Sequence, residues 1–433
     1  MQREILQQGS ENMDYKEALA YIDGLRWYGS RPGLERVGAL LEKLGDPQKK
    51  TKFIHIAGTN GKGSCAAMTA SVLRAAGYRT GLFTSPYLFR FNERMQLDGH
   101  PIPDDTLAAL VTELAPLADA MEEHPTEFEM MTALAMLWYS REQADIVVLE
   151  VGLGGRFDAT NIIEAPEAAV IMNIGLDHTA VLGDTVEQIA FEKAGIIKPG
   201  CEVVLYPQQE SVEAVIRARC EALGAALHTA DFSQITPEFD SLEGQVFSYR
   251  GAPAAIPLLG AHQRRNAAVV LELVEVLRAR GWRIDADAVE HGLYAVSWPA
   301  RFELVHEEPA FIVDGGHNPQ CAETVAENLL HYFPGQRRVL LIGVLADKDY
   351  CHLTEILAPA ADAWVCVTPD SERALPAAEL GRELERFGRP VTVCESIPEG
   401  VSAAMDLAGA DGAVCAVGSL YMAGAIRACF QLY

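Results

Sequence analysis

A glycine-rich segment with one lysine and one serine has the composition of a phosphate-binding loop. The segment runs from Gly58 to Ser64 and reads Gly-Thr-Asn-Gly-Lys-Gly-Ser. Glycines let backbone N–H groups approach phosphate oxygens, and the N-terminus of a following helix adds partial positive charge. Lys62 can reach the terminal phosphates, and the Ser64 hydroxyl can hold Mg²⁺ or a phosphate. Gly63 separates lysine from serine, unlike in the standard P-loop. The segment therefore predicts nucleoside triphosphate binding, against the less favoured alternative of an ordinary glycine-rich turn.

Two further polar side chains follow apolar segments that are typical of buried strands. Glu150 ends the segment 144–150, and His178 follows the segment 168–174. Ligands of open parallel sheets bind beyond the carboxyl ends of the strands, where an acid beside a phosphate loop commonly holds Mg²⁺. A helix-capping role for Glu150 is less favoured because residues 151–155 are rich in glycine. For His178, a structural role and a contact with metal or phosphate both stay open. By spacing alone, Lys193 is an ordinary lysine on a helix surface.

The segments that must position these residues alternate between strand and helix patterns. The loop lies between a predicted strand at residues 53–57 and a helix at residues 64–76. We predict a P-loop-type, doubly wound, mostly parallel α/β sheet with a small antiparallel appendage at residues 232–259, followed by a helix at 266–280. A proline at the end of helical patterning predicts a boundary that divides the chain into residues 1–297 and 298–433.

The second predicted domain is a smaller, Rossmann-like α/β domain. Its strand candidates, separated by helical segments, are residues 311–314, 339–343, 363–368, 391–394 and 413–417.

Composition limits the partners of the 433-residue chain. Its net charge of −25 argues against sequence-independent binding of nucleic acid, which needs clustered lysine and arginine. The nine cysteines include no C-x-x-C pair, which disfavours a structural zinc site or disulfide framework and favours a reducing cytoplasm. No apolar run approaches the length of a membrane span, and the N-terminal residues Met-Gln-Arg-Glu-Ile lack an apolar signal core. We therefore expect no nucleic-acid partner and no membrane partner.

Taken together, the motifs resemble those of folylpolyglutamate synthases, which are often bifunctional with dihydrofolate synthase, in the Mur ligase superfamily. The resemblance covers nearly the whole chain in order. Its most specific parts are residues 58–64 and the block 150–161, and the other matching segments are 33–37, 85–86, 93–94, 128–129, 176–179, 192–195, 262–263, 266–267, 301–303, 314, 317–319 and 347–349.

The resemblance implies roles for individual residues. ATP would be bound by Gly58, Thr59, Asn60, Gly61, Lys62, Gly63, Ser64, Asn266, Arg301, Asp314 and His317. Two Mg²⁺ sites would be held by Ser85, Glu150, His178 and Lys193, the last as a carbamate. The folate pocket would include Thr126, Phe128, Phe157, Asp158 and Ala159. More distant Mur ligases suggest Lys348 and Ser419 for glutamate, with a surface salt bridge and a simple turn as the alternatives.

The implied reaction joins L-glutamate to a carboxylate of folate or dihydropteroate through an acyl phosphate made from ATP. Lys62, Lys193, His178 and Arg301 are the catalytic candidates, and a monomer is expected. A regulatory GTPase is disfavoured because the chain lacks an Asn-Lys-x-Asp motif. A cell-wall Mur ligase would need a further N-terminal domain, and only about 50 residues precede the first strand. Another Mur-type amino acid ligase and a non-catalytic nucleotide-binding module stay as alternatives.

Overall fold

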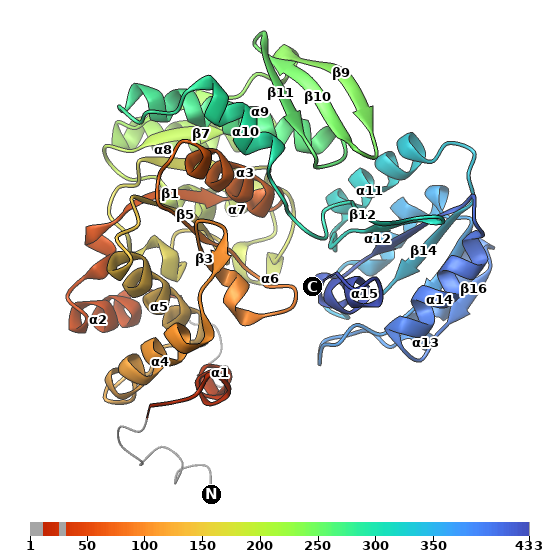
Figure 1. Ribbon diagram of the computed structural model, residues 1–433, viewed down its shortest axis with the longest axis horizontal. Coiled ribbons are helices and arrows are strands. Elements are labelled where there is room, and N and C mark those ends of the chain that lie inside the picture. The colour runs from red at the N-terminus through yellow and green to blue at the C-terminus, as the bar shows by residue number, and fades with distance from the viewer. Residues whose placement is uncertain (1–11, 26–31, 433) are drawn as a thin grey trace, which may run out of the picture. The chain divides into compact units, whose positions relative to one another are not determined.

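The computed structural model describes residues 12–25 and 32–432, which form two compact units (Figure 1). Unit 1 comprises Met1–Phe232 and Asn266–Leu293, and unit 2 comprises Ser233–Arg265 and Tyr294–Tyr433. The N-terminal residues considered for a signal core lie outside the described part of the chain. Contacts thus group the segment 233–265 with unit 2, whereas the division into domains 1–297 and 298–433 stays a prediction.

Unit 1 is built on an eight-stranded sheet with the order β4-β3-β2-β5-β1-β6-β7-β8. Neighbouring strands from β2 to β8 in this order are parallel, and only β3 and β4 run antiparallel at one edge. The strands are β1 Lys52–Ala57, β2 Thr80–Phe83, β3 Met95–Leu97, β4 His100–Pro101, β5 Ile146–Glu150, β6 Ala168–Ile171, β7 Glu202–Leu205 and β8 Ala226–Thr229. The predicted doubly wound, mostly parallel sheet is confirmed.

The central strands of this sheet are apolar because both of their faces are covered. All residues of β2, β5 and β6 are buried, as are those of β1 after Lys52. The helices of unit 1 are α1 Tyr15–Gly24, α2 Glu35–Lys43, α3 Lys62–Ala75, α4 Asp104–Asp119, α5 Glu127–Arg141, α6 Thr179–Leu182, α7 Val186–Lys193, α8 Glu210–Leu223 and α10 Ala286–Tyr294. Short 3₁₀ turns are η3 Pro47–Lys50, η4 Phe91–Arg94, η5 Ala159–Ile162 and η6 Ala194–Ile196.

Helix α9 (Ala261–Ala279) begins earlier than the predicted helix at 266–280, and its first residues belong to unit 2. The predicted appendage is the antiparallel sheet β11-β10-β9, with η7 (Phe232–Gln234) before its first strand. Its strands are β9 Ile235–Ser241, β10 Gly244–Tyr249 and β11 Ala252–Ile256. The antiparallel character of this segment is confirmed.

Unit 2 also contains a six-stranded sheet of order β12-β13-β17-β14-β15-β16, in which only the edge strand β12 is antiparallel. Its strands are β12 Glu303–Glu307, β13 Ala310–Val313, β14 Arg338–Ile342, β15 Ala363–Cys366, β16 Val391–Val393 and β17 Ala413–Val417. Helices lie on both faces (Figure 1): α11 Pro319–Tyr332, α12 Tyr350–Leu357, α13 Ala377–Leu384, α14 Ile397–Ala408 and α15 Ala423–Cys429. The turns η8 Ala358–Ala360, η9 Glu385–Phe387 and η10 Leu420–Met422 complete the unit. The predicted second α/β sheet is confirmed.

Candidate active site

The predicted phosphate loop connects β1 to α3. Hydrogen bonds to Asn173 and Gly175, which follow β6, hold the loop in place. The N–H groups of Thr59 and Asn60 donate to the carbonyl of Asn173 at 2.7 and 3.2 Å. The Thr59 hydroxyl donates to the Gly175 carbonyl at 3.0 Å. The N–H groups of Thr59 and Asn60 are thus already bonded within the protein. The first backbone N–H groups of α3, in contrast, have no acceptor within the helix. The donors suited to a phosphate are therefore those from Lys62 onward.

Gly61 is the N-terminal cap of α3, and its backbone requires a residue without a side chain. Its φ angle is +83°, in the left-handed region that favours glycine. A Cβ at this position would lie 2.8 Å from Oδ1 of Asn266, a buried residue of α9. The structure thus brings Asn266 to the phosphate loop from far along the chain, and its contact with the nucleotide stays a prediction.

Lys193 lies at the end of α7 and is buried beneath the loop, with 4% of its surface exposed. Its Nζ donates to the carbonyl of Gly58 at 2.8 Å. Burial, together with the nearby charge of Lys62, lowers the pKa of Lys193 to about 7. The prediction from spacing of an exposed surface lysine is wrong, because the Lys193 side chain is buried against the Gly58 end of the phosphate loop.

Ser85 and Glu150 meet at the carboxyl ends of β2 and β5. The Ser85 N–H donates to Oε2 of Glu150 at 3.2 Å, and Glu150 is buried. Hard oxygen donors of this kind suit Mg²⁺. Within residues 12–25 and 32–432, however, no group of three or more His, Cys, Asp or Glu side chains is arranged to hold a metal ion. A site here would therefore also depend on Ser85 and on a modified Lys193.

His178 precedes the short helix α6 in a left-handed backbone conformation, with φ of +50°. Its N–H donates to the carboxylate of Asp177 at 2.8 Å, and its side chain is half exposed. A non-glycine residue in this conformation is strained, and such strain is common at binding sites. Its predicted role as a metal ligand stays a prediction.

The folate candidates fall on two segments. Asp158 and Ala159 are buried in the glycine loop, defined here as residues 151–163, whereas Phe157 is exposed beside the guanidinium of Arg156, 4.4 Å from its ring centre. Burial raises the pKa of Asp158, although the carboxylate accepts hydrogen bonds from its own loop. Asp158 therefore organises the loop in this structure, and its contact with folate stays a prediction.

Thr126 and Phe128 lie at the start of α5. The Thr126 hydroxyl accepts the N–H of Glu129 at 3.3 Å, and Glu129 returns a bond to the Thr126 N–H at 2.8 Å. Thr126 is thus the N-cap of α5 in a reciprocal capping box. Glu129 also forms a buried ion pair with Arg36 at 2.9 Å. Phe128 is half-buried and contacts the ring of Phe83 edge-on, with ring centres 6.0 Å apart.

In unit 2, Arg301, Asp314 and His317 gather at the carboxyl end of β13. The Asp314 carboxylate accepts the N–H groups of Phe302 and Gly316 at 2.8 and 2.7 Å. Burial raises the pKa of Asp314, and the positive charge of Arg301 opposes this shift. Ala300 and Phe302, on either side of Arg301, have φ of +56° and +49°, so the turn that presents this arginine is strained.

Lys348 and Ser419 follow the neighbouring strands β14 and β17. Ser419 is buried, and its hydroxyl accepts the N–H of Tyr421 at 3.2 Å as the cap of η10. Asp347 forms its ion pair with Arg373. The glutamate role of Lys348 and Ser419 stays a prediction.

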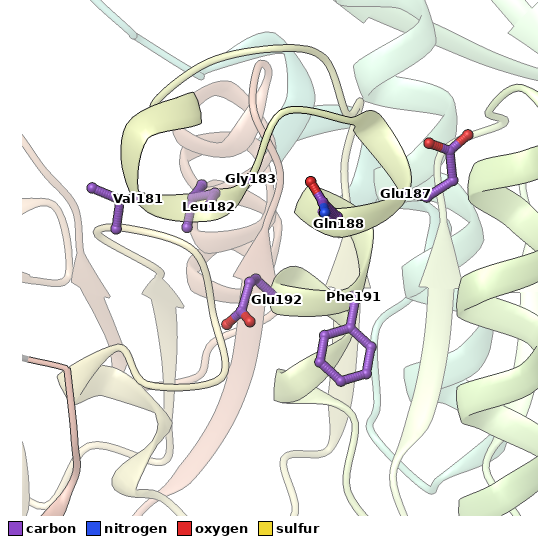
Figure 2. A pocket seen from close by; sticks show the side chains of 7 residues that line it. All are labelled: Val181, Leu182, Gly183, Glu187, Gln188, Phe191 and Glu192. Atoms are coloured by element: carbon purple, nitrogen blue, oxygen red, sulfur yellow. The ribbon is translucent and has the colours of Figure 1, made fainter.

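A pocket of about 460 Å³ lies beside α6 and α7 (Figure 2). Figure 2 shows Phe191 and Glu192, two of its lining residues, projecting from α7. None of the predicted site residues lines it, so it is not the phosphate site. Its lining residues are Val181, Leu182, Gly183, Glu187, Gln188, Phe191 and Glu192.

Sequence reasoning missed several residues that shape the site. Asn173 holds the phosphate loop through its carbonyl. His55, on β1, contacts Thr160 of the glycine loop. Lys198 donates to the carbonyls of Asn161, at 2.8 Å, and Ile163. A polar residue within an apolar strand was the available signal for His55, whereas nothing in the local pattern marks the other two.

Two family models match the chain. The Mur ligase middle domain matches residues 56–274, and the Mur ligase glutamate ligase domain matches residues 300–420. Among the described residues, no helix combines the length and the apolar character that crossing a membrane requires.

Curated proteins and solved structures match over most of their length. The chain is 39% identical to a dihydrofolate synthase/folylpolyglutamate synthase of Bacillus subtilis, covering 84% of this chain and 88% of that protein. It is 36% identical to a folylpolyglutamate synthase of Lacticaseibacillus casei, covering 96% and 98%. The Mycobacterium tuberculosis folylpolyglutamate synthase, solved with ADP and AMPPCP, matches with a TM-score of 0.89 and 33% identity over 97% of this chain and 100% of that one.

Proposed function

The chain belongs to the folylpolyglutamate synthase/dihydrofolate synthase family of Mur ligases, and on that premise we propose how its residues perform ATP-dependent glutamate ligation. The chain is an ATP-dependent ligase that adds L-glutamate to folyl-glutamates. The observation that carries the residue-level proposal is the arrangement of Lys62 at the start of α3, with Lys193 buried beneath the same loop. The Lys62 side chain at this helix N-terminus suits the negative charge of a triphosphate, whereas Lys193, as a carbamate, would offer oxygen atoms to a cation.

Amide formation from a carboxylate needs activation, because a carboxylate is a poor electrophile. The substrate carboxylate attacks the γ-phosphorus of ATP, which gives an acyl phosphate and ADP. The amine of glutamate then attacks the acyl carbon, and inorganic phosphate leaves as the amide forms. Lys62 and the N–H groups that follow it stabilise charge on the transferring phosphoryl group. We assign nucleotide contacts to Asn266, Arg301, Asp314 and His317.

The oxygen donors at the strand ends fit Mg²⁺, which Ser85 and Glu150 would hold at one site and His178 with modified Lys193 at a second. When bound, Mg²⁺ neutralises charge on the phosphate oxygens. Phe128, Thr126 and residues 157–159 form the side of the pocket that receives the pterin. Lys348 and Ser419 receive glutamate, and the protein acts as a monomer.

Lys193 is suited to carbamylation because its lowered pKa makes the neutral amine available near pH 7. The neutral amine attacks CO₂, a carbon–nitrogen bond forms, and one proton is released to give an anionic carbamate. Lys193 would then offer oxygen atoms to a cation instead of a positive charge. ¹³C-bicarbonate labelling followed by NMR checks this, with Lys193→Met as the control. Labelling should rise as pH increases through about 7, and a label that appears only near pH 10 contradicts the buried amine as acceptor.

The test of the function measures phosphate release with ATP and L-glutamate on three carboxylate substrates. Tetrahydrofolate mono-glutamate should support turnover, and a UDP-muramoyl substrate should not. Turnover on dihydropteroate would show that the protein also has dihydrofolate synthase activity. Phosphate release with none of the pterin substrates, or with the UDP-sugar alone, would overturn the proposal.

A further inference from the structure

A buried polar chain links the strand that carries the phosphate loop to the glycine loop. His55 lies in β1, and both His55 and Thr160 are fully buried. Nε2 of His55 is 2.9 Å from Oγ1 of Thr160, and the Thr160 hydroxyl bonds to Oδ1 of Asp158. We call these three residues the buried relay.

The donor and acceptor of each hydrogen bond in the relay follow from Asp158, its last member. The Asp158 carboxylate accepts the N–H of Leu153 at 2.8 Å and that of Thr160 at 3.0 Å. It accepts the Thr160 hydroxyl proton as well, so the Thr160 oxygen is left to accept from His55. His55 therefore carries its proton on Nε2, and it is neutral because burial and the charge of Lys198 lower its pKa to about 3.

Stabilising the fold does not explain why a histidine lies at position 55. Among the described residues, Nδ1 of His55 is buried with no hydrogen-bond partner. A buried polar atom without a partner destabilises a fold, and an apolar residue at position 55 would avoid this. The contribution of His55 thus lies in the bond that it gives to Thr160.

The far end of the relay reaches an aromatic side chain of the predicted pterin pocket. The Asp158 carboxylate accepts the N–H of Leu153 at 2.8 Å and a backbone hydrogen bond from Gly152. A Cβ at Gly152 would lie 2.5 Å from the ring of Phe128, so this ring packs directly on the backbone of the loop. Movement of residues 152–153 would therefore move the surface against which Phe128 rests.

Other contacts fix the opposite end of the glycine loop. The side-chain amide of Asn161 donates to the carbonyls of Arg156 and Gly195 at 3.0 and 3.2 Å. Lys198 bonds to the carbonyls of Asn161 and Ile163. At the Gly152 end, the Val151 N–H donates to the Ile56 carbonyl of β1 at 2.9 Å, and the relay adds a side-chain link from β1 to residues 152–153. The phosphate loop is fixed separately, through Asn173 and Gly175.

We propose that His55 and Thr160 are positioning residues that hold residues 152–153 against Phe128 and thereby set the affinity for the pterin-containing substrate, while nucleotide binding is independent of them. This proposal rests on the proposed function. It assigns Asp158 the task of holding the loop.

The test compares Thr160→Val, which keeps the side-chain shape and removes the hydroxyl, with Thr160→Ser, which restores the hydroxyl. In Thr160→Val, the KM for the pterin substrate should rise roughly tenfold to a hundredfold, as expected for a misplaced substrate surface, while the KM for ATP stays within about twofold. Thr160→Ser should recover most of the loss. Thr354→Val in unit 2 is the matched control, because Thr354 is fully buried and its hydroxyl donates to the Cys351 carbonyl at 2.9 Å.

A second variant separates positioning from stability. His55→Leu with Thr160→Val removes donor and acceptor together, so no buried donor is left without its acceptor. Its thermal midpoint should lie above that of Thr160→Val, while the KM for the pterin substrate stays high. Recovery of the KM together with stability would overturn the proposal, as would an unchanged KM in Thr160→Val, or equal changes in the KM for pterin and ATP. A wild-type protein without turnover on any pterin substrate would instead overturn the proposed function.

Discussion

Each of the two parallel sheets ends an internal strand with a buried carboxylate, but the two carboxylates have different surroundings. Asp314, after β13 in unit 2, accepts two backbone N–H groups of its own turns, at 2.8 and 2.7 Å. Glu150, at the end of β5 in unit 1, accepts the N–H of Ser85 at 3.2 Å from the neighbouring strand. Asp314 thus shapes the turn that presents Arg301, whereas Glu150 joins two strand ends.

This difference shows that a strand-end acid does not by itself indicate a metal ligand. A carboxylate has about four lone-pair positions, and those used by backbone N–H groups are not available to a cation. We expect Glu150 to act on the phosphate chemistry, and Asp314 to contact the nucleotide and to hold the turn that presents Arg301. Four substitutions test this contrast, and three of them have a control variant away from the proposed site.

The largest effect is expected for Glu150→Gln, which keeps the shape and removes the charge. Loss of a cation ligand should lower kcat by roughly a thousandfold, comparable to the loss of an electrostatic stabiliser of the transition state. Steady-state kinetics over a Mg²⁺ titration measure this. Glu167→Gln, which lies before β6 and pairs with Arg280, is the control and should keep near-normal kcat. An equal loss of kcat in Glu150→Gln and Glu167→Gln would mean that the carboxyl ends of the strands have no special role in the reaction.

Arg301→Ala should lower kcat by about a hundredfold, because it removes a positive charge from the transferring phosphoryl group. The thermal midpoint should change little, since the side chain bonds to the carbonyl of its neighbour Ala300. Arg338→Ala, at the amino end of β14, is the matched control in unit 2. A variant at position 301 with wild-type kcat would contradict the role of this arginine.

Asp314→Asn should cost about 1–3 kcal/mol of unfolding free energy, because an amide N–H₂ would face a backbone N–H that needs an acceptor. We expect kcat to fall about tenfold as the turn around Arg301 relaxes, a smaller loss than in Arg301→Ala itself. Chemical denaturation and kinetics measure the two effects. If kcat fell by as much as in Glu150→Gln while stability was unchanged, Asp314 would be acting directly on the chemistry.

The smallest effect is expected for Lys348→Ala, on the loop after β14. The KM for glutamate should rise a few-fold, about 1 kcal/mol, because one charge-assisted contact is lost. Arg386→Ala, an exposed residue paired with Glu355, is the control. An unchanged KM for glutamate would mean that Lys348 is a surface residue without a role in glutamate binding.

Much of the fold could be predicted because strand and helix patterns are local. The apolar run before the phosphate loop predicts β1, and the run ending in Glu150 predicts β5, each to within two residues. The start of α9 was predicted five residues late, at 266 instead of Ala261, because its first turn is polar and carries no apolar periodicity.

The sequence by itself determined the phosphate loop, the strand-end acid and the family, because glycine spacing and motif order are properties of the linear chain. Only the tertiary structure decided that Lys193 is buried under Gly58, that Asn266 meets Gly61, and that His55 reaches Asp158 through Thr160. These contacts join residues far apart in the chain, and burial sets the pKa of Lys193. Desolvation depends on every atom packed around a group, and a local pattern of residue types does not contain that information.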